Sequence, residues 1–271
     1  MEGTMTETTP GLHRLEHIMG MPIGIDVRDS GVDPGILEDV FTWFRWVDAT
    51  FSTYKPESDI SRLNLGELAL DDVHPEVRFI LQRCEELEAE TNGYFNIHAP
   101  MLPPEVLVSP LALTSASVDP SGLVKGWSVD RGARILEDAG LRNFSINAGG
   151  DVLVRGGALP ASRWRIGIQH PFVKDRVAAV VETTDGTVAT SGTYERGNHI
   201  VDPHTGLAST GVLSVTITGP ELGTADAYAT AAFAMGKEGP AWTARLVARG
   251  YEAMTILADH QVLSTPGFPS V

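Results

Sequence analysis

The segment NFSINAGGDVLVRGG, residues 143–157, shows the pattern that decides the fold. It contains two short apolar runs separated by Gly149-Gly150, and paired glycines between such runs are typical of a tight turn between strands. Similar runs predict further strands at residues 17–27, 163–171, 178–192, 213–220 and 251–257. The chain therefore contains a sheet built largely from its second half.

Helices are predicted on both sides of these strands. Asp33-Pro34 and His74-Pro75 each open a run of apolar residues at helical spacing, and Gly140 ends a third run. The five predicted helical segments are residues 33–47, 75–92, 123–138, 224–236 and 239–250. Helices early and late in the chain, with strands clustered between them, predict an α+β fold.

Composition narrows the class of protein. The 271 residues are 42% hydrophobic, which suits a soluble globular chain, and no apolar run reaches the roughly 18 residues of a membrane span. The net charge of −15 argues against a protein that binds nucleic acid or anionic lipid through bulk electrostatics. We expect neither a nucleic-acid partner nor membrane insertion.

Domain organisation and location are also predicted. Residues 1–12 are rich in Thr, Glu and Gly and are expected to be disordered, and residues 13–271 are expected to form one domain. The first residues show no basic and apolar signal, so a cytoplasmic location is expected.

The single cysteine, Cys84, shares a helical face with apolar residues and is interpreted as part of the core.

Residues 118–130, VDPSGLVKGWSVD, place Asp119 and Lys125 around the start of a predicted helix. Free backbone N–H groups and a lysine suit a phosphate group. An ordinary strand-turn-helix corner explains the spacing as well, and the glycines around Asp151 suit either a ligand or a simple hairpin.

Two further segments carry polar residues. Residues 190–206 hold hydroxyls, His199 and His204 in turn-rich sequence, a density that is uncommon outside functional sites. Their spacing does not support a structural zinc site. In residues 224–236, Asp226 and Thr230 lie on one face of a helix, where they could complement the helix dipole or bind Mg²⁺ on a substrate phosphate.

Taken in order, six segments resemble the FAD:protein FMN transferase (ApbE-type flavin transferase) family. They are residues 51–64, 92–96, 118–130, 147–157, 190–206 and 224–236. The resemblance implies an ApbE-like α+β fold with central strands flanked by helices. It also implies Mg²⁺-dependent cleavage of the FAD pyrophosphate, transfer of FMN to a Thr or Ser of an acceptor flavoprotein, and release of AMP.

The resemblance also implies site residues. It assigns the flavin nucleotide to Met19, Tyr94, Phe95, Asn96, Asp119, Lys125, His199 and Ile200. It assigns the metal to Gly122, Asp226, Ala229 through its carbonyl, and Thr230. His199 and Asp226 are the expected catalytic residues, with His199 as the base that takes the proton of the acceptor hydroxyl.

The chain departs from the family pattern at three places. Asn96 stands where the family usually has an aspartate, and the segment between Ala99 and Asp119 is shorter than the usual insert, which predicts a compact variant. Many members are exported lipoproteins, whereas no signal or anchor is visible here. Two alternative functions stay open: hydrolysis of FAD to FMN and AMP, and FAD binding without catalysis.

Overall fold

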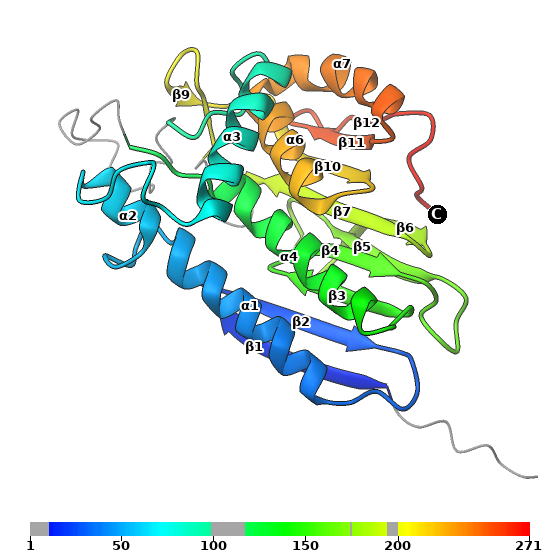
Figure 1. Ribbon diagram of the computed structural model, residues 1–271. Helices are drawn as coiled ribbons and strands as arrows, with labels where there is room; N and C mark the ends of the chain where they lie inside the picture. Colours follow the sequence, from blue (N-terminus) through cyan, green and yellow to red (C-terminus); the bar gives the residue numbers. More distant parts are fainter. Residues whose placement is uncertain (1–10, 99–116, 174, 194–199) are drawn as a thin grey trace, which may run out of the picture.

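The computed structural model describes residues 11–98, 117–173, 175–193 and 200–271 (Figure 1). Its centre is an eight-stranded antiparallel sheet with the strand order β1-β2-β3-β4-β7-β10-β11-β12. The strands of this sheet are β1 (Leu12–Ile18), β2 (Met21–Val27), β3 (Phe144–Ala148), β4 (Asp151–Arg155), β7 (Gly186–Gly192), β10 (Val212–Gly219), β11 (Glu252–Leu257) and β12 (Val262–Ser264). Two small antiparallel pairs are β5 (Trp164–Gln169) with β6 (Val177–Thr183) and β8 (Val201–Asp202) with β9 (Leu207–Ala208).

Helices cover one face of the large sheet (Figure 1). They are α1 (Gly35–Phe51), α2 (Asp59–Asn64), α3 (Pro75–Glu90), α4 (Ser121–Asp138), α6 (Leu222–Ala234) and α7 (Gly239–Thr243), with the 3₁₀ turns Gly236–Glu238 and Ala244–Arg249. The main core lies between these helices and the sheet. The predicted α+β architecture is therefore confirmed.

The opposite face of the sheet is covered by the β5-β6 hairpin, which forms a second, smaller core. Val152 and Val154 point into this second core, whereas Leu153 between them points into the main core. Side chains alternate between the two faces of a strand, so β4 is buried on both sides. This double burial fixes the position of Asp151, which begins β4 on the helix-covered face together with Leu153.

Several local features differ from the sequence predictions. The predicted strand at residues 17–27 is a hairpin, because Met19 and Gly20 take left-handed φ values of 55° and 73° and reverse the chain. The predicted strand at residues 178–192 is two strands in different sheets, β6 and β7. Residues 59–64 form α2, which is capped by Ser58, and neither α2 nor β12 was predicted.

Among the described helices, none has the length and apolarity that crossing a bilayer requires.

Helices α4 and α6 meet backbone to backbone. A Cβ atom on Gly126 would lie 2.6 Å from the carbonyl oxygen of Leu222, and a Cβ on Gly223 would lie 2.9 Å from the amide nitrogen of Trp127. Because side chains are absent at both positions, the two helix axes approach more closely than larger residues would allow.

Helix α3 contacts the same helix layer through Glu90, which accepts a hydrogen bond from Tyr228 of α6 at 2.5 Å.

Cys84 lies in the main core, 1% exposed, as predicted. Burial raises the pKa of its thiol to about 12, so almost no reactive thiolate forms near neutral pH. We expect the native protein to resist alkylation by iodoacetamide at pH 8 and the urea-unfolded protein to react fully. Mass spectrometry of the alkylated chain measures this difference, and rapid labelling of the native protein would contradict the core assignment.

Candidate functional site

A cavity of about 750 Å³ opens beside the helix layer. Its walls come from the β1-β2 turn, the end of α1 and the following loop, the start of α4, the end of β7 and helix α6. Seven of the predicted site residues line it: Met19, Asp119, Gly122, Lys125, Ile200, Asp226 and Thr230. Segments that are far apart in the sequence are therefore brought together around one cavity.

Lys125 forms ion pairs with two buried carboxylates, of which Asp226 lines the cavity and Asp151 does not. Its ammonium nitrogen lies 2.6 Å from Oδ2 of Asp151 and 3.5 Å from Oδ2 of Asp226. Asp151 and Asp226 are 2% and 3% exposed, respectively. Two buried carboxylates close together need compensating positive charge, because removing them from water is costly. Lys125 supplies part of it.

Asp151 is a member of this cluster that the sequence analysis did not assign to the site. Its Oδ1 accepts a hydrogen bond from the amide of Thr190 at 3.0 Å, while its Oδ2 faces Lys125. The Gly-Gly pair before it does form the predicted hairpin between β3 and β4. The available signal was a carboxylate directly after a glycine turn, but its partner Lys125 lies on a helix that precedes it in the chain.

Hydroxyl groups lie next to the carboxylates. Oγ of Ser191 and Oγ1 of Thr230 are 3.3 Å apart, and both residues line the cavity. Within the described residues, no group of three or more His, Cys, Asp and Glu side chains could hold a metal ion by itself. The oxygen donors that line the cavity here are the carboxylate of Asp226 and the neighbouring hydroxyls, a set that fits a hard cation such as Mg²⁺ when substrate phosphates complete the coordination.

The start of α4 also faces the cavity, through Ser121, Gly122 and Lys125. Asp119 accepts a hydrogen bond from the amide of Ser121 at 3.0 Å, which orders the chain just before the helix. Phe95 packs behind Gly122, since a Cβ on that glycine would lie 3.2 Å from its ring. The helix start and the lysine therefore both line the cavity, and phosphate binding by them stays a prediction.

Four assigned residues are not among those that line the cavity. Phe95 is buried behind Gly122, and Ala229 is fully buried in α6. The Tyr94 ring contacts His204 with centroids 4.5 Å apart, and Nδ2 of Asn96 donates to Glu88 at 3.1 Å. Their predicted roles toward the flavin nucleotide and the metal stay predictions.

His199 lies outside the described residues, as does most of the short segment between Ala99 and Asp119. Ile200, which follows His199 directly, is described and lines the cavity. The role of His199 stays a prediction.

Comparisons with known proteins agree with this fold. The ApbE family model matches residues 19–103 and 104–255, and the chain therefore belongs to the ApbE family. The ApbE protein of Thermotoga maritima has the same fold, with a TM-score of 0.83 at 24% identity over 95% of this chain and 98% of that one. The flavin transferase ApbE of Vibrio cholerae gives a TM-score of 0.82 at 24% identity, over 97% of this chain and 100% of that one.

Sequence relatives carry the name FAD:protein FMN transferase. The protein of Treponema pallidum is 30% identical over 69% of this chain, and that of Rhodobacter capsulatus is 29% identical over 97%. The protein of Vibrio cholerae is 37% identical over 45% of this chain. The matched segments span 39%, 55% and 58% of the Vibrio, Treponema and Rhodobacter proteins, respectively.

Proposed function

We propose that this protein is a Mg²⁺-dependent FAD:protein FMN transferase. It would cleave the pyrophosphate of FAD, attach FMN through a phosphoester to a Thr or Ser of an acceptor flavoprotein, and release AMP. The observation that carries the proposal is the ion-pair cluster of Lys125 with Asp151 and Asp226 in an ApbE-family chain. Lys125 and Asp226 line a cavity of about 750 Å³. A cavity of this size is in the range of small-molecule sites.

The charge balance explains why the site has this composition. The chain carries a net charge of −15, so a pyrophosphate can enter only where positive charge is concentrated. The start of α4 faces the cavity, and Lys125 beside it is shared with the carboxylates of Asp151 and Asp226, so this cluster needs a further cation before it attracts phosphate. A Mg²⁺ ion held by Asp226 and Thr230 would supply further positive charge to the phosphate oxygens.

The chemistry required of the protein is mainly positioning. In the transfer, the acceptor oxygen bonds to the phosphorus of the FMN half, the bond to the AMP phosphate breaks, and the acceptor hydroxyl loses its proton. Phosphoryl transfer depends on an aligned acceptor and neutralised charge more than on covalent catalysis. We assign proton removal to His199 and the binding of the phosphates to Lys125.

The test mixes the protein, FAD, Mg²⁺ and a flavoprotein domain with a candidate Thr acceptor, and measures the mass of the acceptor and the nucleotides released. The proposal predicts an acceptor heavier by one FMN and an equal amount of AMP. Free FMN with an unmodified acceptor would instead identify a FAD hydrolase. Intact FAD would identify a binding protein.

The ion pairs of Lys125 change what its removal should do. Two buried carboxylates lie beside this lysine. We expect Lys125→Ala to weaken FAD binding about 10- to 100-fold, as for a lost charge-assisted hydrogen bond. We also expect a lower melting temperature without Mg²⁺, because Asp151 and Asp226 then lack compensation.

Calorimetric titration with FAD and thermal unfolding with and without saturating Mg²⁺ measure both effects. Mg²⁺ should restore much of the lost melting temperature in the variant if the cation binds the same carboxylates. Lys237→Ala removes an exposed lysine away from the cavity and serves as the control. Unchanged affinity for FAD in Lys125→Ala would exclude its contact with the phosphates.

A further inference from the structure

Helix α6, which carries Asp226 and Thr230, does not cap its own N-terminus. Its N-cap residue is Glu221, which makes no capping hydrogen bond with its side chain. The first N–H groups of a helix have no partner within the helix and need one from elsewhere. Here the partner is Asp130 of α4, which accepts from the amides of Leu222 at 2.9 Å and Gly223 at 2.8 Å.

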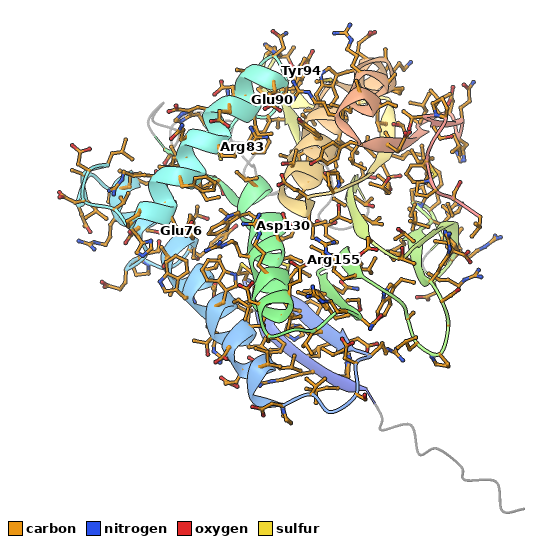
Figure 2. The ribbon with its side chains drawn as sticks, turned by 45° about the vertical axis from the view of Figure 1, so that its right-hand side comes forward. Glu76, Arg83, Glu90, Tyr94, Asp130 and Arg155 are labelled. Carbon is orange, nitrogen blue, oxygen red and sulfur yellow. The ribbon has the colours of Figure 1, made fainter. Side chains whose placement is uncertain are left out.

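The side chain of Asp130 thus connects α4 to the start of α6 (Figure 2). It ends the segment VDPSGLVKGWSVD, and the function proposed above gives it no role. It is four residues after Gly126, so both lie on one face of α4, the face that contacts Leu222 and Gly223. The two helices are therefore joined twice at one crossing, by a close backbone contact and by a carboxylate that accepts two amides.

This crossing sets the geometry of the site. Lys125 is the neighbour of Gly126 on α4, and Asp226 lies one turn after Leu222 on α6. Their side chains approach to 3.5 Å in the cavity. Because each helix is a stiff rod on this scale, a shift of α6 at its first turn is transmitted to Asp226 and changes its distance from Lys125.

We propose that Asp130 is a positioning residue: by holding the first turn of α6 against α4, it sets the separation between Lys125 and the oxygen donors of α6. This inference rests on the proposed function. It assigns Asp130 no contact with FAD, the cation or the acceptor.

Because Asp130 is a buried carboxylate, removing its charge allows its effect on the site geometry to be distinguished from its effect on the stability of the protein. Burial raises its pKa to about 6, although the two amides of α6 oppose the rise. Glu221 raises the pKa further and Arg155 of β4 lowers it, while Arg131 and Arg134 of α4 and Glu76 and Arg83 of α3 line the same groove. Asparagine at this position keeps one acceptor oxygen and avoids a buried charge, but its NH2 group cannot accept from the second amide of α6. We therefore expect a limited loss of global stability, because the relief of the buried charge partly offsets the lost hydrogen bond.

The sign of the pH effect follows from this raised pKa. Between the ordinary value of 3.8 and about 6, the folded protein holds a proton on Asp130 that the unfolded chain has lost. This group therefore contributes stability at low pH that is lost as the pH rises through that interval. Asp130→Asn should remove this contribution to the pH dependence of the melting temperature.

The experiment compares Asp130→Asn, Asp130→Glu and the control Asp138→Asn, which changes an exposed aspartate on the same helix. For each protein, we would measure the melting temperature, FAD affinity at saturating Mg²⁺, Mg²⁺ affinity, and kcat and KM of transfer. We expect Asp130→Asn to melt within a few degrees of the wild type at pH 7, yet to bind FAD about tenfold more weakly and turn over more slowly.

Each outcome decides the proposal. Wild-type FAD affinity and kcat in a folded Asp130→Asn protein would overturn the proposal. A decrease in activity no larger than the fraction of unfolded protein would also overturn it. If Asp130→Asn does not fold, Asp130→Glu decides, since it keeps the charge but displaces the carboxylate by one methylene. Weaker FAD binding in that folded variant supports positioning, and wild-type binding overturns it. A wild type that binds FAD without transferring FMN would refute the proposed function while leaving the affinity test of Asp130 valid.

Discussion

Replacing Asp226 by asparagine is expected to lower the transfer of FMN about 10³-fold while the protein stays folded. The substitution keeps the size of a residue that is 3% exposed, so it opens no cavity in α6. It removes one of the two carboxylates beside Lys125 and the main oxygen donor on that helix. The positive charge that a cation brings to the phosphates should be lost with it.

The dependence of rate on Mg²⁺ concentration identifies the cause. If Asp226 binds the cation, the variant should need much more Mg²⁺ for any residual activity, and calorimetry should show weaker Mg²⁺ binding. The same substitution at Asp39, an exposed aspartate of α1, is the matched control. Full activity of Asp226→Asn at limiting Mg²⁺ would refute the metal assignment.

His199→Ala is expected to reduce the transfer rate by about two to four orders of magnitude, which is the usual contribution of a general base. Among the described residues that line the cavity there is no histidine, and Ile200, the next residue in the chain, is one of those that line it. A base at position 199 should affect the rate but leave FAD affinity and melting temperature near those of the wild type.

The pH profile gives a second, independent measurement. A histidine base predicts that kcat/KM rises with pH through an apparent pKa near about 6.5 and that this limb is absent in His199→Ala. His204 is a suitable control, because its Nε2 lies 3.0 Å from the carbonyl oxygen of Asn92 and it does not line the cavity. If His199→Ala keeps its transfer rate and the rise of kcat/KM with pH, the general base must be another group.

Much of the helix layer could be predicted from local patterns. The apolar spacing that includes Leu37, Val40 and Phe44 predicts α1, and those side chains are fully or almost fully buried. The split of residues 178–192 into β6 and β7 could not be predicted in the same way. Both halves have strand-like composition, and only contacts with distant segments assign one to the β5 hairpin and the other to the large sheet.

The site could be predicted residue by residue only where a motif was recognisable. Spacing alone left Asp226 as either a dipole complement or a metal ligand, and the family motif was needed to choose. Asp151 was missed as a site residue because its turn already had a structural explanation. Asp130 was missed because its partners are the amides of Leu222 and Gly223, about ninety residues later in the chain, and a carboxylate that caps a distant helix leaves no local signal.

The strand order of the large sheet has a consequence for the order of events during synthesis. β2 pairs with β1 on one side and with β3 on the other, and the second pairing joins Ile23 to Ala148. Until residue 148 has left the ribosome, the N-terminal hairpin has an open edge with unpaired N–H and C=O groups. Such edges recruit other strands and cause aggregation. Chains truncated before β3 should therefore self-associate, and nascent chains of that length are where a chaperone would be most needed.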